Sequence, residues 1–219
     1  YDIAEEIDLI EEVARAYGYD NVETNTRMTV DFSKPLRATS LQDEIRNYLI
    51  GAGFNEILTY SLQDRVRGHL MADKAVEVLN PVSADASVLR TSLVPGALTV
   101  VQHNRSHGQK DLRLFEIGNV FGLRGEKPGK TLDAYMEEER LLVVLSGNII
   151  SAQYGSEHRA ADLFDLKGEI QALLSKFCLD KYRFIYYDSA SALIESALAV
   201  EINGSYAGFL GKISRSIAQ

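Results

Sequence analysis

Hydrophobic residues recur at helical spacing in two segments near the start of the chain. In residues 5–17 they stand three to four positions apart and are Ile7, Ile10, Val13 and Ala14. In the segment that follows Ser40 they are Leu41, Ile45, Tyr48, Leu49 and Ala52. Such spacing places apolar side chains on one face of a helix, and serine favours the position just before a helix. We therefore predict helices over residues 5–17 and from Ser40 to Ala52, with a linker between Asn21 and Pro35, where periodicity is lost.

Strand-like patterns dominate the rest of the chain. Runs rich in β-branched and aromatic residues predict strands over residues 55–62, 76–79, 112–121, 141–145, 182–187, 193–202 and 206–213. Helical periodicity returns at 94–103, where Pro95 suits the first turn, and at 165–177. Asn203-Gly204, between the last two strands, is a strong hairpin signal. Because helices and strands do not alternate regularly, we expect an α+β fold, an antiparallel sheet flanked by helices.

The composition narrows the class of protein. Of 219 residues, 46% are hydrophobic and 25% are charged, with a formal net charge of −8, which excludes disorder for the bulk of the chain. No apolar run approaches the ~18 residues of a membrane helix, no signal peptide is evident, and the cytoplasm is the default location. The acidic balance disfavours broad binding to phosphate backbones, so any RNA contact should be local. Since the chain begins at Tyr1 and ends at Gln219 within a strand-to-loop pattern, we interpret it as a fragment of a longer polypeptide.

Few residues suggest catalytic chemistry. The sequence contains no nucleophile elbow, no Walker loop and no dinucleotide fingerprint. The single cysteine, Cys178, stands in a hydrophobic helical context and is expected to be a small core residue. His103 and His107 are spaced i, i+4 and could hold a transition metal, although a solvated helix end also favours histidine.

Acidic residues cluster in the first predicted helix. Asp8, Glu11 and Glu12 share one side of a single turn, and Asp2 lies just upstream. Like charges on one turn repel unless a cation offsets them, and oxygen ligands suit Mg²⁺. The alternative is a solvated acidic face near a helix N-terminus, where the helix dipole favours negative charge. The spacing alone leaves both interpretations open.

Four stretches of the sequence resemble one family. The stretch from Asp2 to Asn21 is similar to the end of the B5 domain in the β subunit of bacterial phenylalanine–tRNA ligase. Three later stretches are similar to the catalytic-like domain that follows B5 in that subunit, and these are Gly53 to Ser61, Leu79 to Gly96, and Arg113 to Phe121. Their order and spacing agree across nearly the whole chain, so the combination is specific.

The resemblance implies a fold of the class II aminoacyl-tRNA synthetase type. Residues 1–33 would be the end of B5 and a linker, and residues 34–219 would be the catalytic-like domain. The resemblance also implies a catalytic α subunit as partner, in an (αβ)2 heterotetramer that attaches phenylalanine to tRNA(Phe) with ATP and Mg²⁺. By motif, the family's Mg²⁺ ligands, shared with the α subunit, fall on Asp2, Asp8, Glu11 and Glu12.

The second predicted helix is expected to serve as a partner interface. In the family, the corresponding helix packs with its α-subunit counterpart in a four-helix interface. The residues expected to contact the partner are Leu41, Ile45, Tyr48, Leu49 and Ala52. Packing onto the chain's own sheet is the alternative, and a wide stripe can do both.

The resemblance further implies that this domain is not itself catalytic. In catalytic class II relatives, an arginine that contacts the α-phosphate of ATP follows the strand that resembles Arg113 to Phe121, and an acidic residue comes two positions later. Here those positions hold Gly122 and Arg124. Losing a charge-assisted contact to phosphate costs several kcal/mol, about 10²-fold or more in rate. We therefore assign no catalytic or cofactor-binding residue, and expect ATP to be used by the holoenzyme and not bound by this chain.

Two alternatives remain to that non-catalytic scaffold. One is a stand-alone adenylating enzyme in which Arg124 replaces the missing arginine, because positions 122 and 124 of a strand face the same way. The other is a stand-alone regulatory module derived from the same fold. Further departures favour the scaffold, since Tyr60 stands where the dimer motif usually ends in proline and the closing glycine-rich motif with its arginine is not found before Gln219.

Overall fold

The computed structural model describes residues 3, 5–29, 40–71, 74–125, 128–129, 131–150, 158–187 and 193–214. The chain divides into two units, residues 1–39 and residues 40–219. In the described ranges, the helices are all too short or too polar to cross a bilayer.

The first unit contains helix α1 (Glu6–Tyr17) and the 3₁₀ helix η1 (Tyr19–Asn21). The backbone N–H of Glu5 donates to the Asp8 carboxylate at 2.8 Å, which satisfies a donor at the start of α1. Gly18 follows the helix with a φ of 90°, a conformation that glycine adopts without strain. None of the residues of α1 is buried, so the predicted apolar stripe of this helix lies exposed on its own unit.

The second unit contains the remaining described elements. Its helices are α2 (Leu41–Gly51), α3 (Arg65–Gly68), α4 (Val94–Ser106) and α5 (Leu163–Lys176), with the 3₁₀ helices η2 (Ala84–Ala86) and η3 (Leu132–Ala134). Its strands are β1 (Asn55–Glu56), β2 (Leu62–Gln63), β3 (Val88–Leu89), β4 (Leu112–Leu123), β5 (Tyr135–Ser146), β6 (Asn148–Ile150), β7 (Arg159–Ala160), β8 (Tyr182–Tyr187), β9 (Ile194–Ile202) and β10 (Ser205–Ile213). Within the described ranges they form the sheets β1-β4-β5 and β10-β9-β8 and the pairs β2-β3 and β6-β7.

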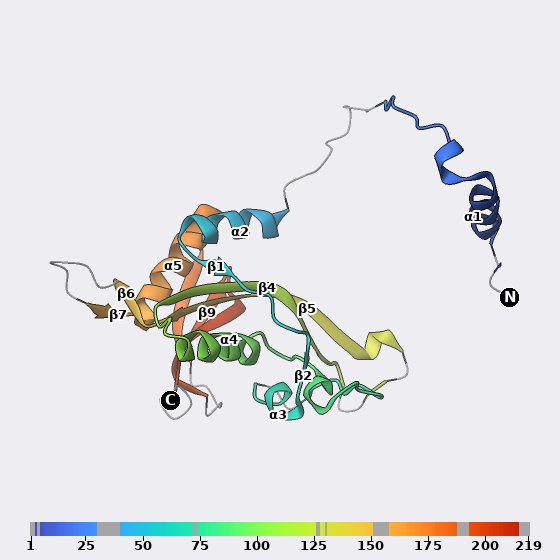
Figure 1. Ribbon diagram of the computed structural model, residues 1–219. Coiled ribbons are helices and arrows are strands. Elements are labelled where there is room, and N and C mark those ends of the chain that lie inside the picture. Colours follow the sequence, from blue (N-terminus) through green and yellow to red (C-terminus); the bar gives the residue numbers. More distant parts are fainter. Residues whose placement is uncertain are drawn as a thin grey trace. The chain divides into compact units, whose positions relative to one another are not determined.

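The hairpin of β4 and β5 is the centre of the first sheet. Its antiparallel register runs from Leu112 opposite Ser146 to Leu123 opposite Tyr135, and β1 joins β4 in parallel. On one face, Phe115 packs in a core with Leu49 of α2 and with Phe54. Helix α4 lies on the opposite side of the hairpin (Figure 1). Because side chains alternate along a strand, the even-numbered residues of β4 point away from the α2 core.

The second sheet has the order β10-β9-β8 and packs against α5. Val200 and Leu210 form a core with Leu174 of α5, and Phe184 lies against it. Asn203 and Gly204 have φ values of 52° and 81°, so the turn between β9 and β10 has both central residues in the left-handed region, as the Asn-Gly signal predicts. This sheet therefore presents one face to α5 and a second face away from it.

Most of the predicted helices and strands are confirmed, as is the mixture of helices with largely antiparallel sheets. The strand expected over 55–62 is wrong as one element, because it divides into β1 and β2 around an extended segment in which Thr59 turns inward. The strand expected over 76–79 reduces to a bridge between Glu77 and Val88. The parallel pairing of β1 with β4 departs from a purely antiparallel sheet.

Cys178 corrects another expectation, because it is exposed and not part of the core. It follows the end of α5 with a φ of 54°, in the left-handed conformation that commonly ends a helix. The core contacts on either side of it are made by Leu174, one turn earlier, and by Leu179, the next residue. The expected boundary between residues 33 and 34 lies outside the described residues and stays a prediction.

Candidate functional site

A buried ion pair lies on the face of β4 that points away from the α2 core. The guanidinium Nη1 of Arg90 donates to Oε1 of Glu116 at 2.6 Å, and the two side chains are 5% and 1% exposed. The Nε of Arg90 also donates to the carbonyl oxygen of Asn119 at 2.8 Å. A buried charge is tolerated when a partner and hydrogen bonds replace water, and this pair has both.

Thr59 completes the cluster from the segment between β1 and β2. Its backbone N–H donates to the Glu116 carboxylate at 3.2 Å, and its hydroxyl lies 2.9 Å from both Glu116 Oε2 and Arg90 Nη1. The hydroxyl can donate to the carboxylate while accepting from the guanidinium. Thr59, Arg90 and Glu116, here called the Arg90–Glu116 cluster, therefore join three segments that are far apart in the sequence.

Two glycines leave room for this cluster. A Cβ atom at Gly118 of β4 would lie 2.4 Å from Nη2 of Arg90, and one at Gly96 of α4 would lie 2.6 Å from Oγ1 of Thr59. Any larger residue at either position would displace a buried polar group. The glycines at these two positions thus serve close packing against the cluster.

The two positions at which the sequence predicts no contact to ATP, Gly122 and Arg124, lie near the end of β4 and just beyond it. Gly122 is buried, and a Cβ atom there would lie 3.2 Å from the Met136 side chain. Arg124, just beyond β4, is exposed, and its Nε donates to the carbonyl oxygen of Tyr135 at 3.0 Å. This hydrogen bond holds the Arg124 guanidinium against the backbone of β5.

The predicted metal ligands are only partly described. Asp2 lies outside the described residues. Asp8 accepts the Glu5 backbone N–H, and Glu12 forms an ion pair with Arg15 at 3.0 Å, while Glu11 is exposed. Among the described residues, no three acidic, histidine or cysteine side chains come close enough together to hold a metal ion. The His103–His107 pair therefore has no third ligand of these types nearby within the described part of the chain. The two imidazole rings instead lie against each other, with centroids 4.3 Å apart.

The stripe predicted on α2 packs largely within its own unit. Leu49 belongs to the core, and Ile45, Tyr48 and Ala52 pack against it, whereas Leu41 is 60% exposed. Burial, together with the nearby Glu169 carboxylate of α5, raises the pKa of Tyr48. Arg46, on the same helix, donates to the Glu56 carboxylate of β1 at 2.9 Å, and this bond is the main reason that its pKa is raised. Four of the five stripe residues thus hold α2 onto the sheet.

Sequence reasoning gave Arg90 and Glu116 no role. A single carboxylate inside the apolar run from Leu112 to Phe121 was nevertheless a usable signal, because a buried carboxylate requires a cation or several donors. The run does not reveal which arginine supplies the partner, since Arg90 is 26 positions away.

The fold resembles that of class II tRNA synthetases. A structure of a pyrrolysyl-tRNA synthetase from Desulfitobacterium hafniense, PylSc, superposes with a TM-score of 0.54 at 16% identity, covering 76% of this chain and 53% of that chain. A likeness at this identity defines the class of fold and nothing more specific.

Sequence comparison defines the family. The model of the phenylalanyl tRNA synthetase beta chain CLM domain matches residues 23–219, so the chain belongs to that family. Proteins named phenylalanine–tRNA ligase beta subunit are similar to it, one from Salinibacter ruber at 41% identity over 79% of this chain and one from Protochlamydia amoebophila at 34% over 99%. These two alignments cover 22% and 27% of the relatives, so the chain spans about a quarter of their length. The resemblance seen in the sequence is therefore confirmed.

Proposed function

We propose that this chain is the end of the B5 domain and the catalytic-like domain of a phenylalanine–tRNA ligase β subunit, acting as a non-catalytic scaffold for a catalytic α subunit. In this proposal the complete (αβ)2 enzyme attaches phenylalanine to tRNA(Phe) in the cytoplasm with ATP and Mg²⁺. The observation that carries the proposal is the Arg90–Glu116 cluster, which commits the buried cation on this face of β4 to an internal carboxylate. A cation paired in this way cannot also neutralise a triphosphate.

The environment of position 122 supports the absence of adenylation. Gly122 offers no cation, and Arg124 is engaged with the Tyr135 carbonyl at 3.0 Å. Charge-assisted contacts to phosphate supply a large part of the catalysis of phosphoryl and adenylyl transfer. A face of the sheet without such a contact supports a scaffold more than an enzyme.

The role of Mg²⁺ is proposed only for the assembled enzyme. Carboxylate oxygens are the right class of ligand for this ion, but the described carboxylates Asp8, Glu11 and Glu12 do not form a set of three. Groups from the α subunit, together with Asp2, would have to complete the site. We assign no step of the reaction to an ion held by this chain alone.

Exposed apolar residues are the better candidates for contact with the α subunit. Leu58 and Tyr60 are 84% and 90% exposed on either side of the inward-facing Thr59, and Leu41 is exposed at the start of α2. Tyrosine is enriched at interface cores, and covering an exposed leucine removes apolar surface from water, which favours association. We propose that Leu41, Leu58 and Tyr60 extend the predicted α2 interface.

Co-purification with the catalytic α subunit tests this proposal. Leu58→Asp and Leu41→Asp should each reduce recovery of the complex at least about tenfold, because a buried unpaired charge costs more than 1.4 kcal/mol. Phe164→Asp, at a residue that is 75% exposed on α5, is the matched control and should leave recovery unchanged. Equal recovery of all three variants and the unsubstituted chain would refute the interface.

Pyrophosphate exchange distinguishes the scaffold from the enzyme alternative. With phenylalanine and ATP, the 219-residue chain alone should give no exchange above the level without protein. Exchange that disappears in Arg124→Ala would establish the adenylating alternative. The regulatory alternative is tested by the mass of the natural polypeptide, because a stand-alone module requires no additional domains.

A further inference from the structure

The face of the second sheet that points away from α5 carries an exposed group of aromatic side chains. This face carries Tyr187 from β8 together with Tyr206 and Phe209 from β10. The centroid of the Tyr187 ring lies 6.5 Å from that of Tyr206 and 6.0 Å from that of Phe209. Tyr206 is 58% exposed and Tyr187 is 38% exposed. We call Ile185, Tyr187, Tyr206 and Phe209 the aromatic face.

The register of the strands explains why these rings lie in the open. Tyr187 and Phe209 lie opposite Ala197 and Ala199, and Gly211 also pairs with Ala197. Residues directly opposite one another project to the same side of a sheet, so small side chains form the floor between the rings. Phe184 and Val200, on the other side, face α5. Ala197, on the floor of the aromatic face, is only 2% exposed, whereas the core shared with α5 lies on the other face of the sheet.

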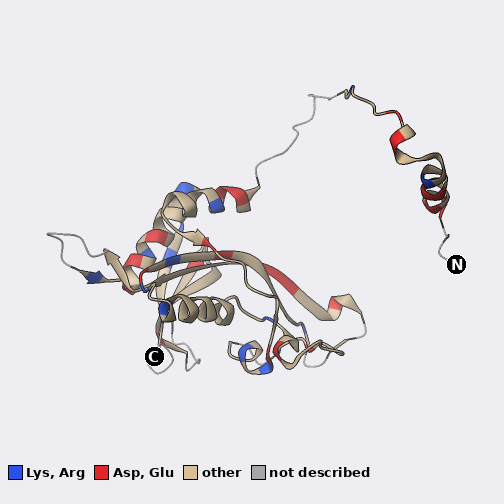
Figure 2. Cartoon of the chain, in the orientation of Figure 1, with Lys and Arg blue, Asp and Glu red and all other residues tan. Residues whose placement is uncertain are grey.

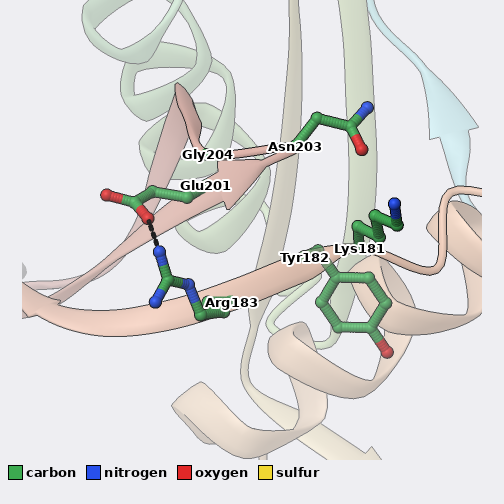
Figure 3. A pocket seen from close by; sticks show the side chains of 6 residues that line it. All are labelled: Lys181, Tyr182, Arg183, Glu201, Asn203 and Gly204. Carbon is green, nitrogen blue, oxygen red and sulfur yellow. Dashed lines mark hydrogen bonds and ion pairs between the residues drawn. The ribbon is translucent and has the colours of Figure 1, made fainter.

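A cationic pocket adjoins the aromatic face at the hairpin end of the sheet. It has a volume of about 400 Å³ and is lined by Lys181, Tyr182, Arg183, Glu201, Asn203 and Gly204. Figure 3 shows the side chains of Lys181 and Asn203 extending together, with Tyr182 directed away from them. Arg183 pairs with Glu201 at 3.1 Å, whereas Lys181 has no ion-pair partner among the residues that the structure describes.

Two residues that line the pocket, Arg183 and Glu201, are neighbours of the aromatic face in the strand register. Tyr206 lies opposite Glu201, which in turn lies opposite Arg183, so the rings begin at the level of the cations. The distance along β8 from Arg183 to Tyr187 is about 13 Å at ~3.3 Å per residue. Negative charge gathers on the middle of β5 and at the start of α2 (Figure 2). Burial raises the pKa of Tyr206, and the Arg140 guanidinium of β5 opposes that rise, so a cation of β5, itself paired with Glu138, also lies near Tyr206.

We propose that this surface binds a short segment of single-stranded RNA, with a phosphate near Lys181 and bases stacked on Tyr206 and Tyr187. Sheets that display aromatic side chains are platforms on which single-stranded RNA modules stack two or three bases. Stacking needs a ring face, whereas a phosphate needs a cation that no carboxylate already neutralises. The combination of exposed rings and an unpaired ammonium favours RNA over an apolar protein surface. This inference does not depend on the scaffold role proposed above.

The test measures binding of a fluorescent single-stranded RNA of about ten nucleotides to the 219-residue chain by anisotropy, in about 50 mM salt. Tyr206→Ala should weaken binding about 5- to 150-fold, the equivalent of losing one stacked base. Its matched control is Tyr186→Ala, because Tyr186 is exposed on the opposite face of β8 and should leave binding unchanged. No binding by the unsubstituted chain, or equal binding by Tyr206→Ala, overturns the proposal.

The contribution of Lys181 is measured by salt dependence. Lys181→Gln should lower the slope of log affinity against log salt by about 0.7, the value for one phosphate contact on a single strand. Lys176→Gln, at the exposed end of α5, should not change the slope. Acetylation of Lys181 should be blocked by the RNA. If the catalytic α subunit protected Lys181 from acetylation and RNA did not, this surface would be a protein interface and the proposal would be overturned. The anisotropy titrations contain no α subunit, so a negative result there leaves the scaffold role unaffected.

Discussion

At the scale of single residues, the second unit depends on one buried charge pair. Arg90 and Glu116 are almost completely removed from water, and each relies on the other for neutralisation. Removing one member of a buried pair costs about 3–5 kcal/mol because the other charge is left unpaired, whereas replacing both by apolar groups costs much less. The pair therefore adds little to the total stability, but it strongly limits which single substitutions at positions 90 and 116 are tolerated.

Glu116→Gln should lower the free energy of unfolding by about 3–5 kcal/mol in urea denaturation, because the Arg90 charge remains buried. The double variant Arg90→Met, Glu116→Leu should lose less than the single variant. If the loss of the double variant equalled the sum of the losses of Arg90→Met and Glu116→Leu measured separately, the two charges would not be coupled.

Asp165 makes a pH-dependent contribution at the start of α5. The hydrogen bond from Arg159 lowers the pKa of the Asp165 carboxyl in the folded chain. A lowered pKa stabilises the fold above the unfolded pKa of about 3.9, and this stabilisation is lost as the pH falls through the folded pKa. The difference in melting temperature between the unsubstituted chain and Asp165→Asn should therefore be constant near neutrality and shrink below about pH 4. Asp180→Asn, at an exposed position beyond α5, serves as the control in the same titration.

At the scale of elements, the turns and strands that depend on neighbouring residues can be predicted from the sequence, whereas the contacts between distant segments cannot. The Asn203-Gly204 turn and the strands β8, β9 and β10 follow from residues that are neighbours in sequence. The Arg90–Glu116 cluster instead combines residues that are 26 and 57 positions apart, and no periodicity encodes such a meeting. The extended segment around Thr59 was mistaken for one strand because its alternation of exposed and inward residues imitates a strand, although its partners are a carboxylate and an arginine.

Gly118 provides a test of packing within β4. Gly118→Ala should destabilise the chain by about 1–3 kcal/mol, since the new methyl group would meet the Arg90 guanidinium at 2.4 Å. The matched control is Gly208→Ala in β10, where nothing lies within 4 Å of the new Cβ atom. That control should be neutral or stabilising, because alanine is less flexible than glycine in a strand. Equal losses in thermal melting would show that the space beside Arg90 is not limiting.

At the scale of the whole molecule, the two units have different relations to burial. Both hydrophobic cores lie within residues 40–219, while α1 exposes its apolar side chains on a unit that buries none of its helix. The family assignment was predictable because its motifs are contiguous in sequence. Which surface the α2 stripe packs against could not be predicted, because the same apolar stripe suits the chain's own sheet and an external partner equally well.

Deleting residues 1–39 should leave the thermal unfolding of the rest nearly unchanged. The expected shift in melting temperature is smaller than the about 2–4 °C that corresponds to 1 kcal/mol for a domain of this size. Calorimetry of the 219-residue chain and of residues 40–219 checks this expectation. A larger decrease would show that α1 contributes to the fold of the second unit.

The mutual dependence of the cluster's arginine and carboxylate also bears on how the family can diverge. A lineage that lost either side chain alone would carry an uncompensated ion in its interior, so single replacements should be rapidly eliminated by selection. The two positions should therefore change together, as a linked substitution, in whichever homologues have lost the pair. Alignments of beta-chain sequences that show the acidic residue persisting beside a hydrophobic replacement of the basic one would contradict this expectation.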